Sequence, residues 1–371
     1  MPPPMDVTPG DKEREQTVSR KAEHVEIVLN EKSRAEKNWW DSVSLIHCSL
    51  PEFDLDEVDL SVELFGKKLK APLIISSMTG GYPDAEKINR NLAEAAARVG
   101  VGLGVGSQRA GILKPEMART FSVVKNLGVP LVFANIGAPQ LIEQHGSTSL
   151  SLAHGKQAMQ MVNADALIIH LNYLQEVVQP EGDTRARGVL EKIKEFAKAY
   201  PVVAKETGAG ISHRVALELK EAGVKGMDVG GVGGTSFSAV EYYRAEKERD
   251  AVRARLGETF WNWGIPTPIS ILEADVGVPV IATGGLRNGL DAAKAIALGA
   301  SAGGMASKML KPATVSADAV VEALEIAIAE LKAAFFLTGC RTVSAMQQSE
   351  LVLSDELLAW VGRLEPPAMS E

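Results

Sequence analysis

From Ala71 onward, short apolar segments alternate with longer amphipathic segments eight times. Each apolar segment has four to six residues, as expected for strands that are buried on both faces. The segments between them, such as AEKINRNLAEAAARVG and GLDAAKAIALGA, carry apolar residues at helical spacing. The strand candidates are residues 72–77, 102–106, 130–135, 166–170, 202–205, 226–229, 279–283 and 302–306. Eight strand–helix units predict a (β/α)8 TIM barrel of the α/β class.

A doubly wound open sheet is the main alternative, because it also alternates strands with helices. A glycine-rich run, Gly102-Leu-Gly104-Val-Gly106, is similar to the fingerprint of dinucleotide-binding sheets. It lies within a strand candidate rather than at a turn that opens a helix, so it does not favour that alternative. A long insertion follows the sixth strand at residues 236–268 and contains Trp261 and Trp263. We expect it to be a helical lid or an oligomer contact.

Four regions follow from this pattern. Residues 1–18 are rich in proline and charge and are predicted to be a disordered tail. Residues 19–70 form an N-terminal extension, ending in a hairpin that turns near Gly66. The barrel covers residues 71–340, and residues 341–371 form a C-terminal tail or helix.

Charge and composition exclude several classes of function. The net charge of −8 and the pI near 5.5 argue against a nucleic-acid partner, and they require a local basic pocket for any anionic substrate. No segment reaches transmembrane length, and the N-terminus lacks the apolar core of a signal peptide. The two cysteines, Cys48 and Cys340, do not form a CxxC motif. We therefore expect a cytoplasmic protein without a membrane partner.

The strand candidates end in polar or glycine-rich sequence. In NADALIIHLNYLQE, the apolar run ends at Ile169 and is followed by His170, Asn172, Gln175 and Glu176. The carboxyl ends of parallel strands meet at one face of a barrel, where active sites lie. This polar cluster therefore predicts part of a site, although an ordinary polar loop would explain the segment alone.

Glycine follows strands six, seven and eight, and in barrels of this kind the last two loops often bind a phosphate. A requirement for tight turns would explain one such loop but not three. A phosphate there, together with polar groups around the barrel mouth, predicts flavin mononucleotide (FMN), with Lys205 beside the ring stabilising negative charge on it. The expected FMN-binding residues are Ser77, Met78, Thr79, Ser107, Asn135, Lys205, Thr235, Gly284, Gly285, Arg287, Ala306 and Ser307.

The chain resembles the type 2 isopentenyl-diphosphate isomerases, which are FMN enzymes with a (β/α)8 barrel. The matching segments are RKAEH, SSMTGG, GSQR, NIGA, HLNYLQE, KETGAG, GGVGGTS, WGIPT and TGGLRNGLDAAKAIALGA. They occur in the order of the family between Arg20 and Ala300, about three quarters of the chain, and the ordered set is specific although each segment alone is not. Tyr173 stands where the family has proline, which we expect to change loop stiffness or one wall of the pocket.

The resemblance implies that isopentenyl diphosphate is converted to dimethylallyl diphosphate, with reduced FMN as the acid and base. Glu176 would bind Mg²⁺ together with the diphosphate, and NADPH would be a transient reductant of the flavin. A tetramer or octamer of identical chains is expected. The implied catalytic residues are Gln175, His170 and Lys205. The implied substrate-binding residues are Arg20, Lys21, Ser107, Gln108, Arg109, Asn172 and Gln175, with the imidazole of His170 adding positive charge.

Other flavin barrels remain alternatives. A hydroxy-acid oxidase or a dihydroorotate-dehydrogenase-like enzyme would need a base and an arginine for a carboxylate, and Arg287 has no histidine beside it. A nucleotide dehydrogenase of the inosinate type would need a cysteine on a barrel loop, whereas Cys48 and Cys340 lie outside the strands. A flavin-binding module without catalysis would leave Arg20 and Glu176 unexplained.

Overall fold

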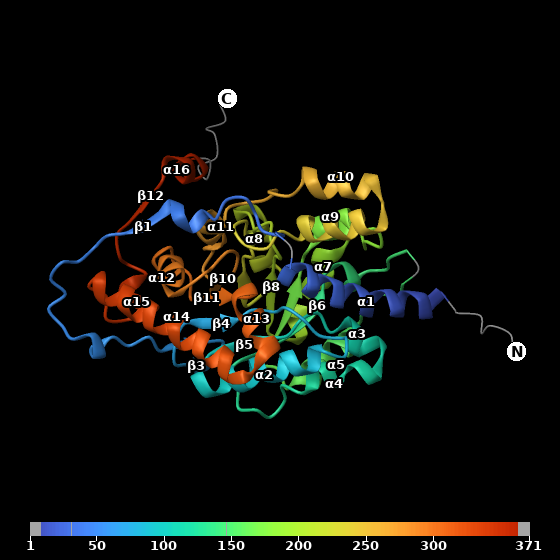
Figure 1. The fold of residues 1–371 in the computed structure, drawn as a ribbon, viewed down its shortest axis with the longest axis horizontal. Coiled ribbons are helices and arrows are strands. Elements are labelled where there is room, and N and C mark those ends of the chain that lie inside the picture. Colours follow the sequence, from blue (N-terminus) through green and yellow to red (C-terminus); the bar gives the residue numbers. More distant parts are fainter. Residues whose placement is uncertain (1–8, 31, 146, 363–371) are drawn as a thin grey trace, which may run out of the picture.

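A closed barrel of eight parallel strands forms the centre of the computed structural model, which describes residues 9–30, 32–145 and 147–362 (Figure 1). The strands are adjacent in the order β10-β11-β4-β5-β6-β7-β8-β9, so the predicted barrel is confirmed and the open sheet is excluded. All eight predicted strands are present, with ends that differ by up to two residues. Their bounds are β4 Leu73–Ile75, β5 Gly102–Gly104, β6 Val132–Gly137, β7 Ala166–His170, β8 Val202–Lys205, β9 Gly226–Asp228, β10 Val280–Ala282 and β11 Ala302–Met305.

Two apolar cores fill the barrel and its surroundings. Ile74, Phe133 and Ile168 belong to a cluster inside the barrel, which also includes Leu64 and Leu69 of the N-terminal hairpin. This hairpin consists of β2 (Val62–Leu64) and β3 (Lys67–Leu69) and turns at Phe65-Gly66, as predicted. It packs against the barrel core and closes the end opposite to the strands' carboxyl ends. That end is therefore filled with side chains and leaves only the carboxyl face for a site.

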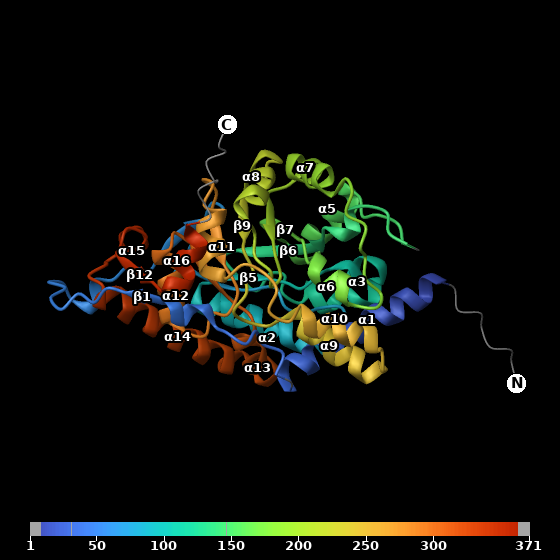
Figure 2. The same cartoon turned by 90° about the horizontal axis from the view of Figure 1, so that it is seen from above.

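The helices surround the barrel, and their apolar faces form the second, larger core (Figure 2). Amphipathic helices at α2 and α7 confirm the predicted periodicity. The barrel helices and the C-terminal helices are α2 Ala85–Val99, α3 Arg109–Leu113, α4 Arg119–Ser122, α5 Leu152–Val162, α6 Tyr173–Val178, α7 Val189–Ala199, α8 His213–Glu221, α11 Thr267–Ala274, α12 Gly289–Ala297, α13 Ser307–Val315, α14 Ala317–Leu337, α15 Val343–Met346 and α16 Asp355–Val361.

The N-terminal extension forms a helix and a short strand that pairs with the C-terminal region. The helix α1 (Pro9–Asn30) includes residues 9–18, which the sequence assigned to a disordered tail, whereas residues 1–8 lie outside the described residues. Further along, β1 (Val43–Leu45) pairs antiparallel with β12 (Leu351–Leu353). The extension therefore joins the C-terminal region, of which residues 363–371 lie outside the description.

The insertion after β9 is helical, as predicted, and consists of α9 (Phe237–Glu248) and α10 (Ala251–Thr259). The helix α9 contacts α1 and α6 as well as α10. These helices, α1, α6, α9 and α10, lie together at one side of the barrel in Figure 2. The insertion thereby connects the N-terminal extension with the segment that follows β7. None of the helices in the described residues is long and apolar enough to cross a membrane.

Candidate active site

A cavity of about 470 Å³ opens at the carboxyl ends of the barrel strands. The structure places nearly all the predicted site residues on its wall. From the N-terminal extension come Arg20 and Lys21, and from the loops of the first barrel half come Ser77, Met78, Ser107, Arg109, Asn135, His170, Asn172, Gln175 and Glu176. From the second half come Lys205, Thr235, Gly284, Gly285, Arg287, Ala306 and Ser307. The polar residues at the ends of separate strands therefore line one cavity.

Gln108 and Thr79 are the two predicted site residues outside the cavity lining. Gln108 is fully buried, and both ends of its amide bond to backbone: Nε2 donates to Ala158 O (2.9 Å), and Oε1 accepts from Asn135 N (2.8 Å). These two hydrogen bonds join α5 to β6. Because Gln108 does not line the cavity, the structure lends no support to its predicted contact with the substrate, which stays a prediction.

His170 lies on the cavity wall, but without the predicted positive charge. Burial, together with the nearby cations Lys205 and Lys21, lowers the pKa of His170 to about 3. The amide of Asn135 donates to Val105 O, so its Oδ1 accepts the proton of His170 Nδ1 at 2.7 Å. The imidazole is therefore neutral, with its proton on Nδ1 and a free acceptor at Nε2. A bound anion would favour protonation of Nε2.

Lys205 is held rigidly at the base of the cavity. Its Nζ lies 2.9 Å from Asp228 Oδ2 and donates to Thr283 Oγ1 at 3.1 Å, and Thr283 in turn donates to Asp228. All three side chains are more than nine-tenths buried. The lysine comes from β8, the aspartate from β9 and the threonine follows β10, and these three strands are neighbours in the barrel. This fixed ammonium can stabilise an anion above it.

The other wall of the cavity fits the phosphate and ring of FMN. Ser76 and Ser77 line it, and their buried hydroxyl oxygens have no partner among the described residues. Gly284 and Gly285 adopt φ of 112° and 78°, and a Cβ on Gly285 would lie 2.4 Å from Gly233 O. At Ser307 the helix α13 begins, and the first N–H groups of a helix have no partner within it. Unused hydroxyls, a glycine cradle and a helix N-terminus are suited to a phosphate.

Arg287 borders this cradle, but its charge is already balanced. The guanidinium bonds Asp41 (2.6 Å to Oδ1) and Asp291 (2.8 Å from Nε to Oδ2). These two carboxylates raise the pKa of Arg287. These bonds tie the N-terminal extension to α12, and the predicted contact of Arg287 with the flavin phosphate stays a prediction. The backbone N–H groups of the cradle remain the donors for a phosphate.

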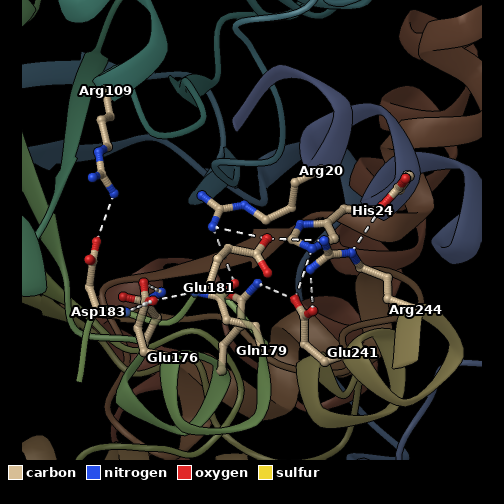
Figure 3. A network of polar contacts seen from close by, with 12 residues as sticks. Arg20, His24, Arg109, Glu176, Gln179, Glu181, Asp183, Glu241 and Arg244 are labelled. Atoms are coloured by element: carbon tan, nitrogen blue, oxygen red, sulfur yellow. Dashed lines mark hydrogen bonds and ion pairs between the residues drawn. The ribbon is translucent and has the colours of Figure 1, made fainter. Parts of the chain in front are cut away.

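Three cations from the predicted set reach the opposite wall. Lys21 donates to Ser107 O, and burial together with Arg20 and Arg109 lowers the pKa of Lys21 to about 7. Arg109 is paired with Asp183 at 2.7 Å. Arg20 lies 3.7 Å from Glu181 and 3.4 Å from Gln179 Oε1 (Figure 3). Three cationic side chains therefore lie close together at this wall, an arrangement suited to binding an anion.

Glu176 lies beside these cations and is 4% exposed. Its Oε1 accepts from Asn172 Nδ2 (3.0 Å), and its Oε2 accepts from Asp183 N (2.8 Å) and from Gln179. Burial raises the pKa of Glu176, an effect that the nearby Arg20 opposes. Within the described ranges, no three His, Cys, Asp or Glu side chains form a ready-made metal site. A cation at Glu176 would therefore need oxygen ligands from a bound diphosphate and water.

Asn172 lines the cavity beside Glu176, and its predicted hydrogen bond to the diphosphate stays a prediction. Its Nδ2 donates one of its two hydrogens to Glu176, and its Oδ1 is buried without a partner among the described residues. The second N–H of the amide can donate to a diphosphate oxygen, and Oδ1 can accept from a water ligand of a metal ion. Asn172 adopts a left-handed backbone (φ 38°) at the start of α6, which orients its amide toward Glu176.

Gln175 is oriented by a residue that the sequence analysis did not identify. Its Nε2 donates to Glu241 Oε1 at 3.0 Å, and His24 Nε2 lies 2.9 Å from the same oxygen (Figure 3). Glu241 is fully buried on α9; the effect of burial, which raises its pKa, is outweighed by His24 and Arg244, and the pKa is lowered to about 2. The bond to Glu241 fixes the amide nitrogen of Gln175, which leaves the amide oxygen for a ligand in the cavity.

Several functional neighbours escaped sequence reasoning. Glu241, Glu181 and Asp183 stand in charged segments, where nothing local separates a buried carboxylate from a solvated one, and Asp228 at the end of a buried strand was missed as well. For Asp228 a signal existed, because it ends a strand and barrel strand ends face the site. Tyr173, the noted departure, is the first residue of α6 and does not line the cavity. Burial raises the pKa of its hydroxyl to about 12.

The chain is similar over most of its length to curated proteins named isopentenyl-diphosphate delta-isomerase. The protein of Thermoplasma acidophilum is 48% identical over 342 residues, covering 92% of this chain and 98% of its own. That of Picrophilus torridus is 47% identical, with coverage of 92% and 98%. The protein of Methanococcoides burtonii is 48% identical, with coverage of 91% and 92%. At these levels of identity and coverage, family membership follows.

Two further comparisons concern the fold and the cofactor. Residues 190–353 match the family described as FMN-dependent dehydrogenase, which supports FMN as the cofactor. Solved structures of mandelate oxidase superpose with TM-scores near 0.6: a complex with (S)-2-phenylpropionate gives 0.60 at 19% identity, covering 94% of this chain and 99% of that one. A second, with benzaldehyde, gives 0.59 at 19% identity and the same coverage. These likenesses show the shared barrel fold.

Proposed function

The chain belongs to the isopentenyl-diphosphate delta-isomerase family, and on this premise we propose that it converts isopentenyl diphosphate to dimethylallyl diphosphate by proton addition and removal, with reduced FMN and Mg²⁺. The observation that carries the proposal is the division of one cavity into two subsites. One subsite, at the glycine cradle and Lys205, fits a flavin. The other, at Arg20, Lys21 and Glu176, fits a diphosphate with its cation.

The diphosphate subsite combines three sources of attraction. Arg20 and Lys21 supply charge from α1, and His170 supplies a neutral nitrogen that can take up a proton when an anion binds. Glu176 would hold Mg²⁺ through one carboxylate oxygen, with diphosphate oxygens and water completing the coordination. Asn172 Oδ1 would accept from such a water.

Proton transfer would take place between this subsite and the flavin subsite. In its reduced form, bound FMN supplies a nitrogen that can exchange a proton with carbon. Lys205, fixed by Asp228, stabilises negative charge on the ring. Gln175 is a poor acid or base by itself, so it positions the alkene, and the buried Glu241 behind it holds the amide in one orientation. The neutral His170 offers a second proton acceptor, Nε2, at the cavity wall.

Exclusion of water is the task of α1 and the insertion. A carbocation-like species would react with water, and a closed site prevents this. The contacts of α9 with α1 and α6 support a closing role for the predicted lid. NADPH as the reductant, a homo-oligomeric assembly and a cytoplasmic location belong to the same proposal.

One experiment tests the function directly. Purified protein is titrated with FMN, reduced anaerobically with dithionite, and supplied with Mg²⁺ and isopentenyl diphosphate, and the dimethylallyl product is followed by NMR. We expect FMN to bind in preference to FAD and product to form only with reduced flavin and Mg²⁺. Bound flavin without product under these conditions would favour a non-catalytic flavin module and refute the proposal.

The pKa of Lys21 predicts how substrate affinity changes with pH. In the substrate-free site this pKa is about 7, so above neutral pH the ammonium loses its proton. A diphosphate binds the protonated form, and therefore its Kd should rise with pH, approaching tenfold per unit above about pH 7. Titration of the FMN-loaded protein between pH 6.5 and 9 measures this. In Lys21→Arg the charge persists, so the alkaline rise should disappear; a flat wild-type profile contradicts the assignment.

A further inference from the structure

Arg244 on α9 is a buried charge to which the proposed chemistry assigns no role. Its side chain is 6% exposed and does not line the cavity. Each of its three nitrogens bonds a different carboxylate: Nε donates to Glu23 (3.0 Å), Nη1 to Glu241 (2.6 Å) and Nη2 to Glu181 (3.0 Å). Figure 3 shows this convergence on one guanidinium.

The three carboxylates come from separate parts of the chain. Glu23 belongs to α1, Glu241 to α9, and Glu181 to the segment after α6. Without the arginine, the buried Glu241 and the partly exposed Glu23 and Glu181 would face one another as three negative charges. These carboxylates raise the pKa of Arg244, against the effect of burial. The arginine therefore makes the close approach of these three elements favourable.

This junction bears directly on the diphosphate subsite. Arg20, Glu23 and His24 are spaced i, i+3 and i+4 on α1, so they share one face of the helix. Glu181 Oε1, which accepts from Arg244, also lies 3.7 Å from Arg20. The contact of Glu23 with Arg244 thus sets the rotation and height of the helix face that carries Arg20 toward the cavity.

We propose that Arg244 is a positioning residue that holds α1 over the barrel mouth, so that Arg20 and Lys21 face the diphosphate. The proposal rests on the proposed function for the identity of the substrate. A purely structural role, the stabilisation of α9 alone, would lower thermal stability without a selective effect on substrate binding. The two roles differ in what happens to α1 and to KM.

The test compares Arg244→Lys and Arg244→Gln with the wild type as FMN-loaded full-length protein. Lysine keeps the charge, but its single nitrogen cannot bond three carboxylates at once. We expect KM for isopentenyl diphosphate to rise about tenfold in both variants, the Kd of FMN to stay within twofold, and amide hydrogen exchange in residues 20–30 to accelerate. Full rescue of KM and exchange by lysine would show that charge alone matters and would overturn the proposal.

Glu23→Gln keeps the proposal testable if the arginine variants do not fold, because it weakens only the α1 contact. It should reproduce the rise in KM and the faster exchange of α1. Arg255→Gln is the matched control, since Arg255 lies on the adjacent α10 and pairs with Glu258 on the surface; it should change neither. Unaltered KM and α1 exchange in Glu23→Gln would refute the proposal. An inactive wild type would refute the proposed function instead, and exchange would then decide the role of Arg244.

Discussion

Replacement of Glu176 by glutamine is expected to lower kcat/KM for isopentenyl diphosphate at least a hundredfold, while the Kd of FMN stays nearly unchanged. The described residues offer no cluster of three potential metal-ligating side chains, so this carboxylate is the main protein ligand for Mg²⁺ in the proposed site. Glutamine keeps the size but removes the charge, and a metal ion that stabilises diphosphate charge contributes several kcal/mol. A hundredfold loss corresponds to about 2.7 kcal/mol.

Steady-state rates at increasing Mg²⁺ measure this effect, together with flavin content and melting temperature. Glu195→Gln serves as the matched control, because Glu195 is half-exposed on α7 and pairs only with Lys192 in the described contacts. It should leave both the rate and the Mg²⁺ dependence unaltered. Wild-type-like activity of Glu176→Gln at limiting Mg²⁺ would count decisively against the metal assignment.

Loss of Arg20 has the second largest expected effect. We expect Arg20→Ala to raise KM for isopentenyl diphosphate ten- to a hundredfold, with little change in FMN affinity. A charge-assisted hydrogen bond contributes roughly 1.5–3 kcal/mol, which corresponds to that range. In the substrate-free structure the partners of Arg20 are distant, at 3.7 Å from Glu181 and 3.4 Å from Gln179, so its removal costs the fold little. Glu181 keeps its bond to Arg244.

Substrate titration of the reduced variant separates this role from a structural one. An arginine that only decorates a helix surface would change stability within about 0.5 kcal/mol and leave KM alone. Arg214→Ala provides that baseline, because Arg214 is an exposed residue on α8 that pairs with Glu218 one turn away. If Arg20→Ala behaved like Arg214→Ala, the N-terminal helix would have no part in substrate binding.

The sequence by itself determined the barrel and most of the cavity wall. Strand and helix periods are local, and β7 and β8 have the predicted residues at both ends. The carboxyl ends of the strands must meet at one face of a barrel, so polar strand ends such as His170 and Lys205 could be placed together without coordinates. Glycine after β10 likewise predicted a cradle that only residues without a Cβ can form.

Only the tertiary structure decided which polar atoms are available. Gln108 follows a strand just as Ser107 does, yet its amide is bonded on both sides by backbone from distant segments. Arg287 sits in the predicted loop, but Asp41, 246 residues away, shares its charge. A sequence pattern indicates that a side chain is near the site, whereas hydrogen-bond partners from other elements determine whether it faces inward or is already satisfied.

The ion pairs at Arg244 are a case in which sequence patterns did not identify a residue whose partners lie far away in the chain. Glu23 and Arg244 are 221 residues apart, and each stands in a charged stretch typical of a solvated helix. Periodicity reports which face of a helix is apolar, but it does not report which second helix covers the polar face. The packing of α9 against α1 and α6 buries Arg244 and leaves Glu23 partly exposed, and a buried charge requires a partner of opposite sign. That pairing, rather than any local motif, places the N-terminal helix over the barrel mouth.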